Sequence, residues 1–102
     1  MLKHLTAADF DQTIRNGAVV VDFFADWCGP CRMLAPVLES LAEENTDIAI
    51  YKVNVDEEPD LARRYGIMSI PTMLFFRDGQ LIDKAVGAIG KPSIQSKLDA
   101  LR

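Results

Sequence analysis

The sequence predicts an α/β fold in which a mixed central sheet has helices on both faces. Residues 18–25 form a dense Val/Phe run, which is typical of a central strand covered on both sides. Two later strand-like runs, 72–76 and 81–86, are separated by Asp78-Gly79, a hairpin signal. Helical periodicity between the strands completes the order β-α-β-α-β-α-β-β-α, a βαβ half followed by a β-hairpin-α half.

The first elements are expected to be short. Residues 2–5 could pair as an edge strand, and we predict one there. Thr6 followed three residues later by Asp9 resembles a capping box, and Phe10 and Ile14 form an apolar pair four residues apart. A short helix should therefore follow the edge strand.

Two longer amphipathic helices are predicted, one over residues 28–44 and one that begins near Lys91-Pro92. Pro36 lies inside the first helix and predicts a kink there. Their apolar positions are Leu34, Leu38 and Leu41 in the first helix, and Ile94, Leu98 and Leu101 in the second.

The middle of the chain is predicted to contain a second interior strand and a short helix. Residues 48–56 alternate between two faces, as an interior strand does. Pro59 is placed to open the short helix, and Gly66 is placed to end it.

Composition and charge limit the possible functions. A chain of 102 residues predicts one domain, 1–102, and no internal repeat is present. The net charge of −4 and the absence of a basic cluster argue against nucleic acid as a partner. We find neither a secretory signal nor a membrane-spanning stretch, so a cytoplasmic location is expected. In that compartment a C-x-x-C pair is more often catalytic or metal-binding than structural.

The only two cysteines, Cys28 and Cys31, directly follow the predicted central strand and begin a helix. Unpaired N–H groups and the helix dipole at this end should stabilise a Cys28 thiolate. Cys31 lies about one turn further, so that both sulfurs can share a face and close a small disulfide ring. Gly29 permits a tight turn, and Pro30 sits in the first turn, where its missing N–H removes no helical bond.

Two other interpretations of the cysteine pair are weaker. A zinc site needs about four ligands, and the chain offers two thiols and a single distant imidazole, His4, so no metal site is predicted. A purely structural disulfide across so short a loop would remove little entropy from the unfolded chain. Redox catalysis is therefore the favoured interpretation.

With these motifs the chain resembles the thioredoxin family. Residues 27–31, Trp-Cys-Gly-Pro-Cys, match the family's active-site motif, and Val21-Asp22-Phe23 precedes it at the family's spacing. Residues 65–67 and 70–72 match a second signature, and the similarity covers essentially the whole chain. The resemblance implies the thioredoxin fold and a general protein-disulfide reductase. It further implies disulfide-containing protein substrates, re-reduction by thioredoxin reductase and no cofactor besides the Cys28–Cys31 pair. We expect a monomer without a membrane partner.

Asp22 lies within an apolar strand, and desolvation there should raise its pKa. The alternative is a carboxylate at a strand end whose oxygens accept backbone hydrogen bonds. By resemblance, Asp22 is the buried acid that takes the proton of Cys31 through water. Lys52 could be an ordinary lysine that extends to solvent, but its family counterpart lies near the buried acid, so a modulating role is expected.

The resemblance also identifies a surface for substrate. In the family, the proline at position 71 is cis and lies beside the cysteines, and the residue before it, here Ile70, pairs its backbone with an extended substrate. The residues expected to modulate the chemistry of the cysteines are Gly29, Pro30, Lys52 and Pro71. The residues expected to contact substrate are Trp27, Gly66, Met68, Ile70 and Gly87. For Trp27 and Met68, ordinary packing is an equal alternative.

The chain departs from the family pattern at three places that bear on partner choice. Phe24 stands where many members have Trp, Met68-Ser69 where a well-known member has Arg-Gly, and Arg32 where Lys is common. Two rival functions also remain: a disulfide oxidant or isomerase with the same chemistry in another direction, and a docking module in which the cysteines are incidental. The Gly29-Pro30 pair and the intact motif favour the reductase.

Overall fold

The computed structural model describes all of residues 1–102 and contains a four-stranded mixed sheet. Its strands, in the spatial order β2-β1-β3-β4, are β1 (Ala18–Phe24), β2 (Ala49–Asn54), β3 (Thr72–Arg77) and β4 (Gln80–Val86). The β1 and β2 strands are parallel, whereas β3 is antiparallel to both β1 and β4. This is the mixed sheet that the sequence predicts, built from a βαβ half and a hairpin half.

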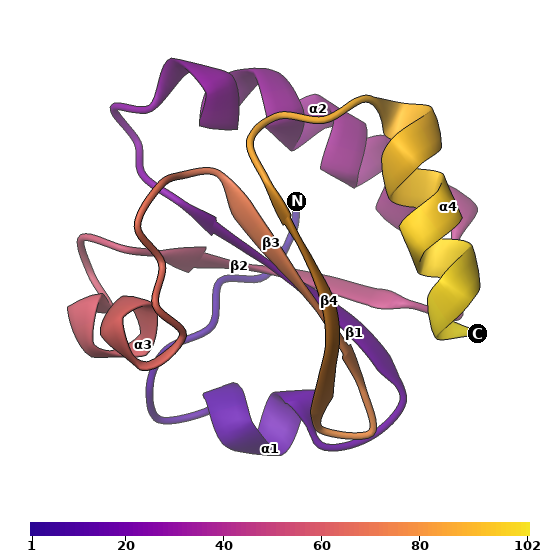
Figure 1. Cartoon of the computed structure of the whole chain (residues 1–102), viewed down its shortest axis with the longest axis horizontal. Helices are drawn as coiled ribbons and strands as arrows, with labels where there is room; N and C mark the ends of the chain where they lie inside the picture. The colour runs from indigo at the N-terminus through magenta and orange to yellow at the C-terminus, as the bar shows by residue number, and fades with distance from the viewer.

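Helices cover both faces of the sheet (Figure 1). On one face, α2 (Gly29–Glu44) and α4 (Lys91–Leu101) bury their predicted leucine and isoleucine stripes against Val20. On the other, α1 (Phe10–Ile14) and α3 (Pro59–Arg64) pack against the neighbouring strand positions. Successive residues of β1 therefore face different helices, as the period of a strand requires. None of the helices combines the length and the apolar character needed to cross a bilayer.

The predicted edge strand at residues 2–5 is wrong. Only His4 bridges to β2, in a parallel pairing with Lys52. The Leu5 N–H donates to the Lys52 carbonyl at 2.8 Å, and the Lys52 N–H donates to the Lys3 carbonyl at 3.0 Å. Two hydrogen bonds fix the segment to the edge of β2, but they do not make a fifth strand.

The turn that follows explains why this pairing stops. Asp9 accepts a hydrogen bond from the Thr6 N–H at 2.7 Å, which is one half of the predicted capping box. The helix itself begins later, at Phe10. The Thr6–Asp9 turn therefore directs the chain away from the sheet and into α1.

The α2 helix continues through Pro36 from Gly29 to Glu44. Proline has no N–H, so the bond to the carbonyl of Arg32 cannot form. The missing bond does not divide the helix, and its apolar face remains continuous beneath the active-site end.

Gly66 ends α3 as predicted, in a Schellman motif. The Ile67 N–H donates to the Ala62 carbonyl at 2.9 Å, and the Gly66 N–H donates to the Arg63 carbonyl at 3.1 Å. Gly66 has a φ of +63°, which a residue with a Cβ rarely adopts.

The β3–β4 connection is the two-residue turn that the sequence indicates. Asp78 and Gly79 have φ values of +50° and +85°, the pattern of a type I′ turn. Asp78 also ties the tip of the hairpin to the residue before β1. Its carboxylate accepts from the Gly17 N–H at 2.7 Å, and its own N–H donates to the Gly17 carbonyl at 2.9 Å.

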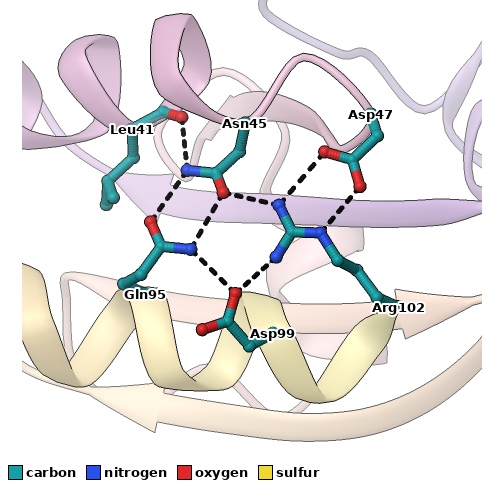
Figure 2. A network of polar contacts seen from close by, with 6 residues as sticks. All are labelled: Leu41, Asn45, Asp47, Gln95, Asp99 and Arg102. Atoms are coloured by element: carbon teal, nitrogen blue, oxygen red, sulfur yellow. Dashed lines mark hydrogen bonds and ion pairs between the residues drawn. The ribbon is translucent and has the colours of Figure 1, made fainter.

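A polar network joins the C-terminal end of α2 to α4 (Figure 2). Asn45 donates from Nδ2 to the Leu41 carbonyl at 2.8 Å and to Gln95 Oε1 at 2.9 Å. Gln95 Nε2 donates back to Asn45 Oδ1 at 2.9 Å. Arg102 reaches the same Asn45 oxygen at 2.6 Å and pairs with Asp47 at 2.7 Å. The end of α2 is thus closed by side chains from the end of the chain.

Candidate active site

Cys28 and Cys31 form a disulfide at the N-terminal end of α2. Cys28 is the N-cap residue, with an extended backbone, and its Sγ accepts a hydrogen bond from the Cys31 N–H at 3.2 Å. Gly29 and Pro30 are the first two helical residues. The geometry agrees with the sequence-based placement of both cysteines.

This position favours a thiolate at Cys28 once the disulfide is reduced. The Cys31 N–H already points at the Cys28 sulfur, and the N-terminal end of a 16-residue helix carries partial positive charge. Cys28 is 5% exposed and Cys31 is 3% exposed. The pair can therefore form and break a bond at the surface of the fold while most of each side chain stays covered.

Asp22 is completely buried in β1, and neither carboxylate oxygen has a hydrogen-bond partner. The alternative expectation, a carboxylate satisfied by backbone donors, is therefore wrong. Desolvation raises the pKa of Asp22 to about 7, although the charge of Lys52 acts in the opposite direction. A carboxyl with this pKa can accept or release a proton near neutrality.

Lys52 lies directly across from Asp22 in the parallel β1–β2 pair. Its ammonium group lies 4.1 Å from the centre of the Phe24 ring. Lys52, Phe24 and Cys31 together line a hollow of about 130 Å³. The structure therefore places Lys52 beside the buried acid and near one of the two sulfurs.

The Ile70–Pro71 peptide bond is cis, as the family resemblance implies. The Ile70 carbonyl oxygen lies 3.8 Å from Cys28 Sγ, a contact and not a hydrogen bond, because a disulfide sulfur carries no proton. The Ile70 N–H donates to no group in the protein. The Gly87 N–H donates to the Pro71 carbonyl at 2.7 Å, so Gly87 supports this loop.

A second, mostly apolar hollow of about 190 Å³ is bordered by Ile70. Trp27 is 68% exposed and Met68 is 97% exposed, so neither is an ordinary core residue. Of the predicted contact residues, Trp27, Met68 and Ile70 line this hollow, whereas Gly66 and Gly87 do not. The other lining residues are Val55, Ala62, Ile67 and Ser69.

Sequence reasoning missed Asp56. The Trp27 indole N–H donates to Asp56 Oδ2 at 2.9 Å, which orients the exposed ring. In the sequence Asp56 belongs to an acidic run before Pro59, which suggested only a favourable charge at a helix N-terminus. A signal would have been its place directly after a strand parallel to the one that leads to Trp27.

No group of three or more His, Cys, Asp or Glu side chains is placed to hold a metal ion. His4 instead packs edge-on against Phe24, with the ring centres 5.1 Å apart. It lies at the edge of the sheet, beside β2.

Comparison with known proteins identifies the family of this chain. The thioredoxin family model matches residues 1–100. Thioredoxin of Chlamydia caviae is 49% identical over 94 residues, 92% of each chain, and thioredoxin of Staphylococcus aureus is 50% identical over 96 residues, 93% of this chain and 92% of that one. The solved structure of oxidized mitochondrial thioredoxin 3 from Saccharomyces cerevisiae has a TM-score of 0.92 and 36% identity, and covers 98% of this chain and 95% of its own. The chain therefore belongs to the thioredoxin family and is a dithiol–disulfide oxidoreductase whose redox-active pair is Cys28–Cys31.

Proposed function

We propose that this chain is a general protein-disulfide reductase that thioredoxin reductase returns to the dithiol form. The observation that carries the proposal is the position of the Cys28 sulfur. It caps α2, receives the Cys31 N–H and lies 3.8 Å from the backbone of Ile70, next to an apolar hollow. An anionic nucleophile and a place for substrate thus adjoin one another.

The reaction begins when the Cys28 thiolate attacks one sulfur of a substrate disulfide. A mixed disulfide forms between Cys28 and the substrate, and the other substrate sulfur leaves as a thiolate. Cys31, deprotonated, then attacks Cys28 Sγ and displaces the second substrate sulfur. Two electrons pass to the substrate, which leaves as a dithiol, and the Cys28–Cys31 disulfide is restored.

Asp22 is the proton acceptor for Cys31, through water. Its burial and its pKa of about 7 support this role, because a base must be able to take a proton near the working pH. Its two unpaired oxygens leave both acceptor positions open to such a water. Lys52, the only charged neighbour that lowers its pKa, modulates the strength of this base.

Substrate binds as an extended segment along Ile70. The free Ile70 N–H and the nearby carbonyl support pairing with a substrate main chain, a mode that makes few demands on side chains. Trp27 and Met68 offer apolar contact, and Gly66 and Gly87 flank the segment without side-chain obstruction. Broad selection among proteins follows from such main-chain recognition.

The remaining parts of the proposal rest on the length, charge and composition of the sequence and on family membership. The chain works as one domain, 1–102, and as a monomer in the cytoplasm, with no cofactor other than its own disulfide. Neither nucleic acid nor membrane is a partner. The electrons come from thioredoxin reductase.

Reduction of insulin disulfides, driven by thioredoxin reductase and NADPH, tests the proposal. Cys28→Ser should lose turnover almost completely, because Cys31, the one thiol left, does not occupy the N-cap position of α2 and cannot close the Cys28–Cys31 disulfide. Cys31→Ser should instead accumulate a mixed disulfide with insulin, visible by mass. Ser96→Ala, at an exposed position of α4, is the control and should behave as wild type.

Two results would contradict the proposal in different ways. Equal rates for wild type and Cys28→Ser would leave only a docking role. A reduction potential close to that of a periplasmic disulfide oxidant would identify the chain as an oxidant in place of a reductase.

A further inference from the structure

Asp22, Phe24 and Lys52 share the face of the sheet that α2 covers. Asp22 and Phe24 are two residues apart in β1, so their side chains point the same way. Lys52 is the cross-strand partner of Asp22 and therefore lies on that face too. The lysine thus has two neighbours that could attract its ammonium group, a carboxyl and an aromatic ring.

The ammonium group lies on the ring. Lys52 Nζ is 4.1 Å from the Phe24 ring centre, whereas neither oxygen of Asp22 has a hydrogen-bond partner. A cation over an aromatic face is attracted by the ring quadrupole, most strongly where water is excluded. Phe24 is buried and Lys52 is half-buried, so the contact is partly shielded from water.

The N-terminal segment, residues 3–5, contacts both Lys52 and Phe24. Lys3 and Leu5 each form one backbone hydrogen bond with Lys52, at 3.0 and 2.8 Å. Between them, His4 packs its ring against Phe24 at an angle of 64°. The bridge that replaces the predicted edge strand therefore holds both the lysine backbone and the ring that its ammonium group contacts.

This cluster borders the hollow that reaches Cys31. Phe24, Lys52 and Cys31 line it, and the other charged residues around it are Asp26 and Arg32. Arg32 is engaged, because it donates to the Asp26 carbonyl at 2.9 Å. Lys52 is thus the only cation of the hollow that no hydrogen bond restrains.

We propose that Phe24 is a positioning residue for proton transfer, whose ring holds the Lys52 ammonium group away from Asp22 and leaves the buried carboxyl free to accept the proton of Cys31. The proposal rests on the proposed role of Asp22 as that acceptor. It gives Phe24, at a position where this sequence departs from the family pattern, a function beyond packing.

The physical basis is a competition for one cation. While Asp22 is protonated it carries no charge to attract Lys52, and the ring contact prevails. When Asp22 ionises, a lysine at contact distance would stabilise the carboxylate and make it a weaker base. The ring opposes that movement, so the carboxyl keeps its high proton affinity.

Titration of the Asp22 carboxyl by ¹³C NMR in the oxidised protein tests the proposal. Phe24→Leu should lower the midpoint by about half a pH unit, because Lys52 is released toward the carboxylate. Phe24→Trp should leave the midpoint unchanged, because an indole offers the same kind of face. Pentafluorophenylalanine at position 24 keeps the ring but reverses its quadrupole, and it should lower the midpoint as leucine does, without a cavity.

Lys52→Met supplies the control. In that background Phe24→Leu should cause no further shift, since the cation that the ring restrains is gone. A rise or no change in the midpoint of both the leucine and the pentafluorophenylalanine variants would overturn the proposal. An equal fall with and without Lys52 would also overturn it.

The same variants separate this proposal from the role of Asp22 itself. In Phe24→Leu, the acid limb of the pH profile for insulin reduction should move by the same amount as the NMR midpoint. If Asp22→Asn leaves turnover unchanged, the proposed role of Asp22 fails. The NMR midpoints would still decide whether Phe24 restrains Lys52.

Discussion

Asp22 and Asn45 are both buried polar residues of the α2 side of the fold, but their surroundings are opposite. Asn45 is 3% exposed, and its amide bonds to Leu41, Gln95 and Arg102 (Figure 2). Asp22 is 0% exposed and has no hydrogen-bond partner at all. Burial of a polar group without partners costs free energy, whereas a satisfied group contributes to stability. Asp22 is thus the one buried side chain whose polar atoms lack hydrogen-bond partners, whereas those of Asn45 have them.

The comparison shows where stability and chemistry are in conflict. A carboxyl that accepted two or three hydrogen bonds would be ionised at low pH and would be useless as a base near neutrality. Asp22 avoids this because the strand around it is apolar. Its high pKa and its destabilising effect therefore have one cause, which is the desolvation that burial imposes.

The largest effect is expected for Asp22→Asn. Between the ordinary pKa of 3.8 and the folded value of about 7, the native protein binds a proton that the unfolded chain lacks. Wild-type stability should therefore fall as the pH rises through this window, by roughly 4 kcal/mol in total, and stay reduced above it. Asparagine does not titrate, so the variant should be more stable than wild type by several kcal/mol near pH 9.

Urea unfolding at about pH 4 and about pH 9 measures this difference. The two proteins should converge at the lower pH, where both side chains are neutral. Insulin reduction by the variant should be slower at neutral pH. If wild type and Asp22→Asn were equally stable at both pH values, Asp22 would not be desolvated in solution.

Asn45→Ala should act in the opposite direction. The substitution removes the bonds to Leu41, Gln95 and Arg102, and we expect a loss of about 2 kcal/mol that is similar near pH 5 and pH 9. Insulin reduction at a temperature well below unfolding should not change. Asn16→Ala, an exposed asparagine, is the matched control and should unfold as wild type does. If the loss of stability in Asn45→Ala depended strongly on pH, the expected difference between Asn45 and Asp22 would be contradicted.

Arg102→Gln should have the smallest effect. Arg102 pairs with Asp47 at 2.7 Å, and this hydrogen bond lowers the pKa of Asp47. Because the pKa of Asp47 is lower in the folded protein, the ion pair stabilises the protein at neutral pH. This stabilisation is lost as the pH falls through the folded pKa of Asp47. Both side chains are substantially exposed, so the loss in the variant should be smaller than for Asn45→Ala and should shrink in high salt. If Arg102→Gln lost as much stability as Asn45→Ala, independently of salt, Arg102 and not Asn45 would be the main stabilising residue of the polar network.

Most of the fold could be predicted from the sequence because its signals are local. A strand that ends at Phe24, shortly before Cys28, indicates the start of α2, and the Asp78-Gly79 pair indicates the hairpin turn. Gly66 marks the end of α3 through its positive φ. Each of these features depends on a few neighbouring residues, and the structure contains all three.

The features that could not be predicted from the sequence depend on contacts between residues far apart in the chain. The N-terminal segment forms only two hydrogen bonds with β2 because the chain turns at Thr6. The alternation of apolar and polar side chains does not show where this turn begins. The bond from Trp27 to Asp56 joins residues 29 positions apart, and the Lys52 contact with Phe24 spans two strands. That no group donates a hydrogen bond to Asp22 could be expected from its apolar neighbours in sequence but not established from them.

The paired bonds between Gly17 and Asp78 have a practical consequence for protein engineering. An exposed two-residue hairpin tip is normally a favourable site for grafting a peptide or opening the chain. Here the tip also anchors the residue that leads into the central strand, through bonds of 2.7 and 2.9 Å. An insertion between Asp78 and Gly79 would therefore loosen two parts of the sheet at once, and a permuted or tagged version of this protein should be cut elsewhere.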